Sequence, residues 1–249
     1  MTSTPVRPKI GTLSRADMTT RDSSETEGAK AGLVDAAHRA IKEAIRENVF
    51  PPGYQAAEAE IAGQLGMSRT PIHEAMTRLQ EEGLVRILPR RGILIRALTP
   101  EDMQEIYEVI IALEGAAAER IALSPEAVRT PLLETLEAAT DAMDAALKSD
   151  DLLSWARADE QFHDAMVSRC GNRRLTRMIG TVTDQSHRSR TLTLQLRPKP
   201  VGSAEEHRAI ILAIRSGEGP AANQAARAHR QNARDQILPL VARLNLRNL

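Results

Sequence analysis

The sequence is poor in the residues that build disulfide frameworks and aromatic cores. Its 249 residues include one cysteine, and aromatic residues make up 2%. The lone thiol, Cys170, excludes an intrachain disulfide and is typical of a reducing compartment. So few aromatic rings leave alanine, leucine, isoleucine and valine to fill the interior. This composition favours closely packed helices over a β-sandwich.

Long apolar runs and a net charge are missing as well. No stretch approaches 18 consecutive apolar residues, and the N-terminus has no apolar signal core, so we expect a cytoplasmic protein without a membrane span. The formal net charge is +0, so the whole-chain charge does not indicate nucleic-acid binding. Residues 68–96, however, contain arginines 69, 78, 86, 90, 91 and 96 against glutamates 74, 81 and 82. That local excess suits contact with a phosphate backbone.

Apolar residues, at 42% of the chain, are plentiful enough for two modest domains. Residues 1–30 are rich in serine, threonine and charge, and we predict a disordered tail there. Residues 31–98 and residues 99–249 each show the periodicity of a packed domain. The fold class predicted for the whole chain is mainly α.

The first predicted domain, 31–98, combines helices with a hairpin. A helix from Leu33 is ended by the prolines and glycine of residues 50–53. Ser68 is a good N-cap for the third helix. The pattern further predicts helices at 58–65 and 69–82 and strands at 84–88 and 93–97. This element order predicts a winged helix-turn-helix.

The start of the helix at 69–82 is suited to reading DNA. A helix fits the major groove and presents its N-terminal side chains to base edges. Arg69 can give a guanine two hydrogen bonds, and Thr70 and His73 lie one turn apart on the same face. Arg90 and Arg91, at the hairpin tip, can enter the minor groove or contact phosphates. Any one of these arginines alone could equally be a solvated surface residue.

The second predicted domain has helical signals and no strand signal. Capping residues, prolines and glycines divide it into six helices, typical of an antiparallel bundle. They lie at about 99–123, 124–148, 152–169, 173–196, 203–215 and 218–244.

Histidine and aspartate are arranged in this domain as metal ligands would be. Asp159 and His163 are i, i+4 neighbours on one helix, and His207 and His229 lie on two later helices. One carboxylate and three imidazoles can hold a divalent transition metal and leave positions for water or a ligand. The spacing alone leaves open that these histidines are hydrogen-bonded or exposed.

The DNA-reading segment closely resembles that of GntR-superfamily regulators. The resemblance rests on Gly66-Met67-Ser68-Arg69-Thr70-Pro71, Glu82-Gly83-Leu84-Val85 and Pro89-Arg90-Arg91-Gly92. By this resemblance the DNA-contacting residues are Ser68, Arg69, Thr70, His73, Arg91 and Gly92, to which we add Arg90. The family usually has arginine where this chain has His73, and an imidazole cannot supply the same fork of donors.

A second resemblance rests on Leu98-Thr99-Pro100-Glu101-Asp102, Leu113-Glu114, Phe162-His163, Gly171-Asn172, Glu206-His207 and Ala228-His229. By these residues the region from Thr99 to Leu244 looks like the effector domain of the FadR-type (FCD) branch of that superfamily. The resemblance implies that Asp159, His163, His207 and His229 hold a metal, with zinc expected and nickel or another divalent metal as alternatives. It also implies a small carboxylate effector. Many relatives have an arginine at the position of Ile110, where it can pair with an acid. For this chain Arg188 and Arg190 are the candidates for that role.

These features together predict a regulator rather than an enzyme: a homodimer that binds a palindromic DNA operator, with repression relieved by the effector. One alternative is a metal-dependent phosphohydrolase of HD type built on His163-Asp164. It needs a further upstream histidine, and only His38 and His73, in the DNA-binding module, are available. Another alternative is a purely structural metal site.

Overall fold

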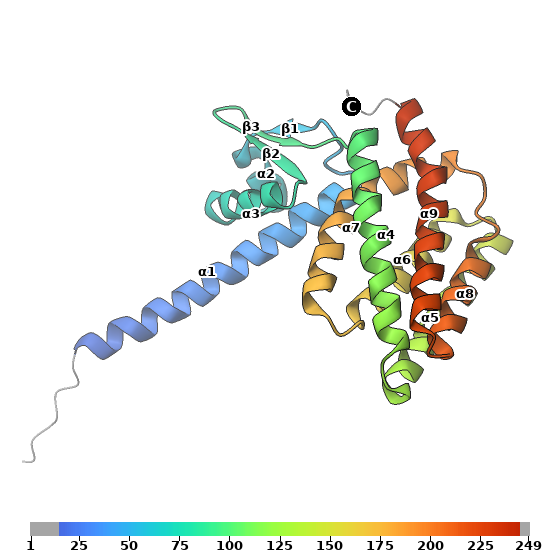
Figure 1. Cartoon of the computed structure of the whole chain (residues 1–249). Helices are drawn as coiled ribbons and strands as arrows, with labels where there is room; N and C mark the ends of the chain where they lie inside the picture. Colours follow the sequence, from blue (N-terminus) through green and yellow to red (C-terminus); the bar gives the residue numbers. More distant parts are fainter. Residues whose placement is uncertain (1–14, 245–249) are drawn as a thin grey trace, which may run out of the picture.

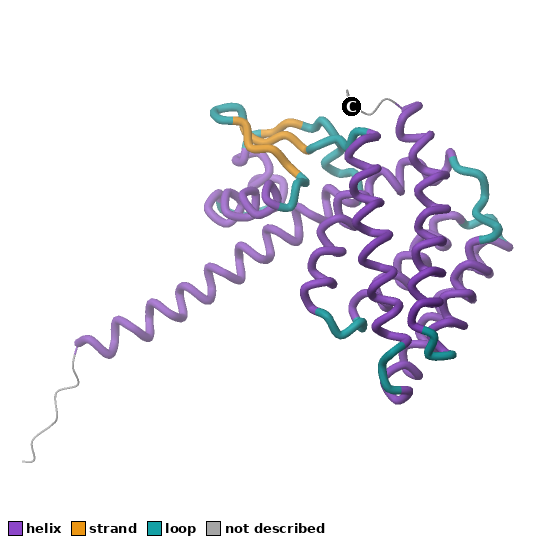
Figure 2. The backbone as a smooth tube through the Cα atoms, viewed as in Figure 1, coloured by secondary structure: helices purple, strands orange, loops and turns teal. Residues whose placement is uncertain are grey.

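The computed structural model describes residues 15–244, and Figures 1 and 2 show a small lobe with the strands beside a larger helical lobe. Helix α1 (Arg15–Arg46) runs into the small lobe from a projecting N-terminal half. Residues 15–30 are therefore helical, contrary to the predicted tail; residues 1–14 lie outside the described residues. Adding residues to an existing helix costs far less free energy than nucleating a new one, so residues 15–30 can be helical without an apolar face.

The small lobe is a winged helix-turn-helix, as predicted. Its further elements are β1 (Gln55–Ala56), α2 (Glu58–Leu65), α3 (Arg69–Glu81), β2 (Val85–Leu88) and β3 (Gly92–Ile95). The strands form an antiparallel sheet in the order β1-β3-β2, with Leu88 opposite Gly92 at the hairpin end. Strand β1 is an addition to the prediction, because two residues are too short to show a period. The core of this lobe includes Ile41, Ile61, Ile72, Leu79 and Ile93.

Gly92 is required by the close approach of β1 to the wing. Its φ is +89°, and a Cβ placed there would lie 2.1 Å from the carbonyl oxygen of Ala56. Any side chain would therefore push β1 away from β3. Gln55 ties the same strand to the hairpin tip by donating from Nε2 to the carbonyl oxygen of Arg91, at 3.0 Å.

The large lobe consists of the six predicted helices. They are α4 (Pro100–Ala122), α5 (Glu126–Lys148), α6 (Leu152–Ser168), α7 (Arg173–Thr193), α8 (Ser203–Arg215) and α9 (Gly219–Leu244), with a short 3-10 turn η1 (Leu194–Leu196) after α7. Thr99 and Asp102 form a reciprocal capping box at the start of α4. Across 15–244, no helix is both long enough and apolar enough to cross a membrane.

A polar seam joins the two lobes; we use this name for the contacts that Asp184 and Gln185 of α7 and Glu82 make. Asp184 accepts hydrogen bonds from Lys42 at 2.8 Å and from Arg46 at 2.9 Å, both on α1. Gln185 donates to the carbonyl oxygen of Glu82, which caps the recognition helix α3, at 2.7 Å. Helix α7 therefore holds both α1 and the end of α3.

Candidate metal centre and nucleic-acid interface

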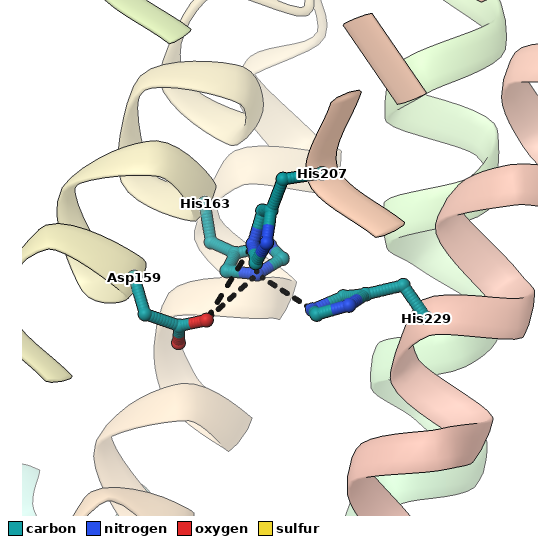
Figure 3. Close-up of side chains that lie close together, drawn as sticks. All are labelled: Asp159, His163, His207 and His229. Atoms are coloured by element: carbon teal, nitrogen blue, oxygen red, sulfur yellow. Dashed lines mark hydrogen bonds and ion pairs between the residues drawn. The ribbon is translucent and has the colours of Figure 1, made fainter. Parts of the chain in front are cut away.

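Asp159 and His163 of α6, His207 of α8 and His229 of α9 converge in the interior of the bundle (Figure 3). All four are buried, and one ligand atom from each lies within 4.8 Å of all the others. Nε2 of His163 lies 3.2 Å from Nε2 of His229 and 3.3 Å from Nε2 of His207. Oδ1 of Asp159 lies 3.5 Å from Nε2 of His207. The tertiary structure thus brings the four predicted ligands together.

The opposite nitrogen of each ring faces an oxygen. Nδ1 of His207 lies 2.7 Å from the carbonyl oxygen of Ser203, and Nδ1 of His229 lies 2.7 Å from Oε2 of Glu206. Nδ1 of His163 lies 2.9 Å from Oε2 of Glu114, close enough for an ion pair but off the direction of a hydrogen bond.

These acceptors favour the tautomer with the proton on Nδ1, which turns the Nε2 lone pairs toward one another. Three lone pairs and a carboxylate crowded together repel unless a cation lies between them. The donor set therefore fits a divalent transition metal such as zinc.

The electrostatics keep these groups in the protonation states that a metal needs. Burial lowers the pKa of His163 to about 4, and the nearby Arg230 acts in the same direction. Burial also lowers the pKa of His207, assisted by His229. For Asp159 burial opposes ionisation, but the imidazoles and Arg190 outweigh it and hold the pKa below its usual range. His163 and His207 are thus neutral and Asp159 is charged at neutral pH.

A buried ion pair between Arg230 and Glu114 adjoins His163 of the candidate metal centre. Arg230 of α9 donates two hydrogen bonds of 2.7 Å to the carboxylate of Glu114 on α4. The charge of Arg230 outweighs the effect of burial and keeps the pKa of Glu114 below its usual range. Glu114 therefore presents a charged oxygen to His163.

A cavity of about 320 Å³ adjoins the metal centre, and we call it the metal-side cavity. Asp159 and His229 line it. Its cationic lining residues are Arg190, Arg197, Lys199 and Arg230. Its volume is that of a site for a small molecule, and its basic lining suits an acid.

Sequence reasoning identified one of these cations and missed the others. Arg190 lines the cavity, but one of its nitrogens lies 2.5 Å from Oδ2 of Asp159, so it is already paired. Arg188 lies on α7, and its side chain is outside the described positions. Arg197, Lys199 and Arg230 belong to no motif, and folding alone places them beside the ligands.

Ile110 and Asp164 are not among the four converging ligands and do not line the metal-side cavity. Ile110 packs in an apolar cluster of α4 and α9, where no acid could be bound. Asp164, the partner of His163 in the phosphohydrolase alternative, is exposed and is not part of the ligand cluster. The carboxylate in that cluster is Asp159, one turn earlier, which argues against the HD pattern.

The predicted DNA-reading residues lie together on the winged-helix lobe. Ser68 is at the N-cap of α3 with no hydrogen bond from its side chain to the helix, and Arg69 and Thr70 are exposed in the first turn. At the hairpin tip Arg90 and Arg91 are exposed, and Arg90 has a φ of +63°. Exposed cations and free helix N–H groups are the means by which such folds contact DNA.

His73 is exposed on the same helix but has a partner in the protein. Its Nδ1 lies 2.8 Å from Oε1 of Glu58 on α2, and its side chain is 62% exposed. Glu58 therefore orients the ring and favours the proton on Nδ1, which leaves Nε2 facing outward as an acceptor. Nothing in the sequence pattern marked this pair.

Known proteins match both lobes. Residues 33–95 match the family described as bacterial regulatory proteins, gntR family, and residues 105–232 match the FCD domain. A helix-turn-helix transcriptional regulator from the TAR-I ttuE-ttuC' intergenic region of Agrobacterium vitis is 64% identical over 138 residues, 55% of this chain and 81% of that protein. A probable D-xylose utilization operon transcriptional repressor of Paenarthrobacter nicotinovorans is 30% identical over 190 residues, covering 74% and 80% of the two chains.

A solved structure shares the fold. A putative GntR transcriptional regulator from Rhodococcus sp. RHA1 superposes with a TM-score of 0.66 at 24% identity, over 83% of this chain and 97% of that one. The family matches and the curated relatives are transcription regulators, which confirms the expectation of a regulator rather than an enzyme. The chain belongs to the GntR family of bacterial transcription regulators and carries an FCD domain.

Proposed function

We propose that this chain is a repressor that binds a palindromic operator as a homodimer and is released by a small organic acid. The exposed residues Ser68, Arg69, Thr70, His73, Arg90 and Arg91, together with the half-buried Gly92, would contact the DNA. Two copies related by a two-fold axis would present two recognition helices to two half-sites. The relative from Paenarthrobacter nicotinovorans, named as a probable repressor, supports the direction of the effect. A regulator of operators would act in the cytoplasm.

The observation that carries the effector part of the proposal is the convergence of the three Nε2 atoms with Asp159 beside the metal-side cavity. Asp159, His163, His207 and His229 would hold zinc, or nickel or a similar metal. A bound metal would attract an oxygen of the effector and neutralise its charge. Arg190 or Arg197 would take the place of the arginine that is absent at Ile110, since both line the cavity.

Helix α7 offers a physical route from the cavity to the DNA-binding lobe. Arg190 contacts Asp159, while Asp184, nearly two turns earlier on the same helix, contacts Lys42 and Arg46 of α1. An acid that draws Arg190 away from Asp159 would alter the position of α7 and so the polar seam. Such an effector must bind the two arrangements with different affinity, because equal binding shifts no population.

The test combines three measurements on one preparation: elemental analysis for bound metal, a thermal-shift screen of small organic acids, and operator binding with each hit. The expected result is about one metal per chain, and an acid that both stabilises the protein and weakens operator binding. Acids that leave operator affinity unchanged would favour a purely structural metal site. Bound metal with no affinity for any selected DNA sequence would refute the proposal.

A further inference from the structure

A second cavity, of about 370 Å³, lies where the two lobes meet, and we call it the interdomain cavity. Its walls come from the end of α1, from α6 and from the α7–η1 segment. Trp155, Arg190 and Arg197 line both cavities, but none of the four candidate metal ligands lines this one. We propose that the interdomain cavity is a separate, metal-independent site for a small organic monoanion with an apolar body, such as an aromatic carboxylate.

The apolar part of the site is supplied by α6 and η1. Leu153, Trp155 and Ala156 come from α6, and Leu194 from η1. Trp155 and Leu194 are buried, whereas Leu153 is 55% exposed at the edge. Small-molecule sites combine such an apolar wall with a few fixed polar groups. A ring-sized apolar body is therefore the shape that this wall accommodates.

Two of the four arginines in the cavity have carboxylate partners. Arg46 contacts Glu160 at 2.5 Å, and Arg190 contacts Asp159 at 2.5 Å. Among the described residues, neither Arg157 nor Arg197 forms a salt bridge with a carboxylate, although Asp151 lies near enough to Arg157 to interact with its charge. Arg157 donates to Oγ of Ser154 at 3.4 Å, and Arg197 donates to the carbonyl oxygen of Arg190 at 3.4 Å.

Arg197 is held beside Trp155 rather than beside an acid. Its guanidinium carbon lies 5.7 Å from the centre of the indole ring. Burial and the charge of Arg190 lower the pKa of Arg197. A partly buried guanidinium in this setting gains more from an anion than a solvated one does.

Trp155 contributes buried apolar surface to the wall of the site. Its side chain is 5% exposed, and Nε1 has no hydrogen-bond partner among the described residues. The indole ring, rather than this buried N–H group, is the part of Trp155 that a ligand in the cavity would contact.

The opposite rim limits the ligand to one negative charge. Glu43 and Glu47, near the end of α1, line the cavity and are exposed. A second carboxylate on the ligand would approach this rim and be repelled. The metal-side cavity has Asp159 and Glu206 as its acidic lining residues, and there a bound metal would be needed to attract a second carboxylate.

Tryptophan fluorescence tests the proposal directly, because Trp155 is the one tryptophan in the sequence. The probes are benzoate, benzyl alcohol, which has the ring without the charge, and acetate, which has the charge without the ring. Benzoate should change the emission with a saturable dependence, and the two others should bind at least about tenfold more weakly. No saturable change with benzoate up to about 10 mM would overturn the proposal.

Three variants locate the binding. Arg157→Gln alters a residue that lines the interdomain cavity alone and should raise the Kd for benzoate about tenfold. Arg174→Gln, an exposed arginine lining neither cavity, should leave the Kd unchanged. Lys199→Gln alters a residue that lines the metal-side cavity alone and should also leave it unchanged.

Chelation separates this site from the proposed effector site. Benzoate binding should persist after metal removal, with circular dichroism confirming that the chain stays folded. Loss of benzoate binding on chelation, together with an unchanged Kd in Arg157→Gln, would assign the signal to the metal-side cavity and overturn the inference. The inference stands without the proposed repressor function, since no step of it uses DNA.

Discussion

Asp159 and Glu160 are adjacent on α6, yet their carboxylates contact different parts of the molecule. Asp159 faces the imidazole cluster and Arg190 of α7, whereas Glu160 lies 2.5 Å from Arg46 of α1. His187 contacts Glu160 as well, at 3.3 Å, and not the metal centre. Two adjacent residues of α6 therefore belong to different contacts: Asp159 to the candidate metal centre and Glu160 to the contact between the lobes.

The polar seam should matter for the response to the effector. Asp184→Asn removes the charge that Lys42 and Arg46 share, and hydrogen bonds to charged groups contribute about 1.5–3 kcal/mol each. We expect a loss of about 1–3 kcal/mol in the free energy of unfolding and a weaker release of DNA by the effector. Urea unfolding and operator titrations measure the two effects. Asp235→Asn, whose exposed carboxylate pairs with its neighbour Arg234, is the control.

Removal of a ligand should empty the metal centre. His163→Ala and His207→Ala each delete one of the four converging groups, so the variants should lose most of their metal. His187→Ala, a histidine outside the cluster, should keep it. Elemental analysis of the purified variants measures their metal content. Wild-type metal content in both ligand variants would reject this site.

Glu114 should be needed for both stability and metal affinity. Glu114→Gln leaves Arg230 as an uncompensated buried charge, which costs about 3–5 kcal/mol in unfolding free energy. It also removes the charged oxygen behind His163, so metal affinity should fall about 10–100-fold. Denaturant unfolding and metal competition test these effects, with the exposed Glu108→Gln on the same helix as control. A variant as stable as the wild type would contradict the importance of this pair.

Arg69 should discriminate between bases. Its exposed position in the first turn of α3 predicts that Arg69→Ala loses about 1–3 kcal/mol of preference at one base pair of each half-site. Selection of an operator followed by binding to single-base variants measures this preference. Arg78→Ala, later on the helix and paired with Asp35, should retain it. An unchanged ranking of operator variants in Arg69→Ala would remove Arg69 from the base-reading set.

His73 should set the preference at another base. Because Glu58 favours the tautomer with an outward acceptor, His73→Arg replaces an acceptor by a fork of donors. The preference at one position of each half-site should change by about 1–3 kcal/mol, while affinity for random DNA rises little. The same operator series shows this, and a uniform gain across all sequences would count against a base-reading role.

Local sequence signals were sufficient to predict the six helices of the FCD domain. Thr99 and Asp102 show why: a helix start depends on a few neighbouring residues, which the pattern contains. Strand β1 and the first half of α1 were missed, because a strand of two residues has no period and a helix can extend without an apolar face.

The resemblance to the FCD branch, together with residue types and helical spacing, was enough to propose four candidate metal ligands, since an aspartate and a histidine four apart share a face. The convergence of these four residues could not be predicted from the sequence, because it depends on how α6, α8 and α9 pack. The positions of Glu114 and Arg230 beside them depend on tertiary packing in the same way. The same holds for Arg197 and Trp155, which lie 42 positions apart and belong to no motif. The sequence alone indicated the family, the helices of the large lobe and the candidate metal ligands. The tertiary structure decided which charges are paired and where cavities form, because both depend on contacts between residues distant in the chain.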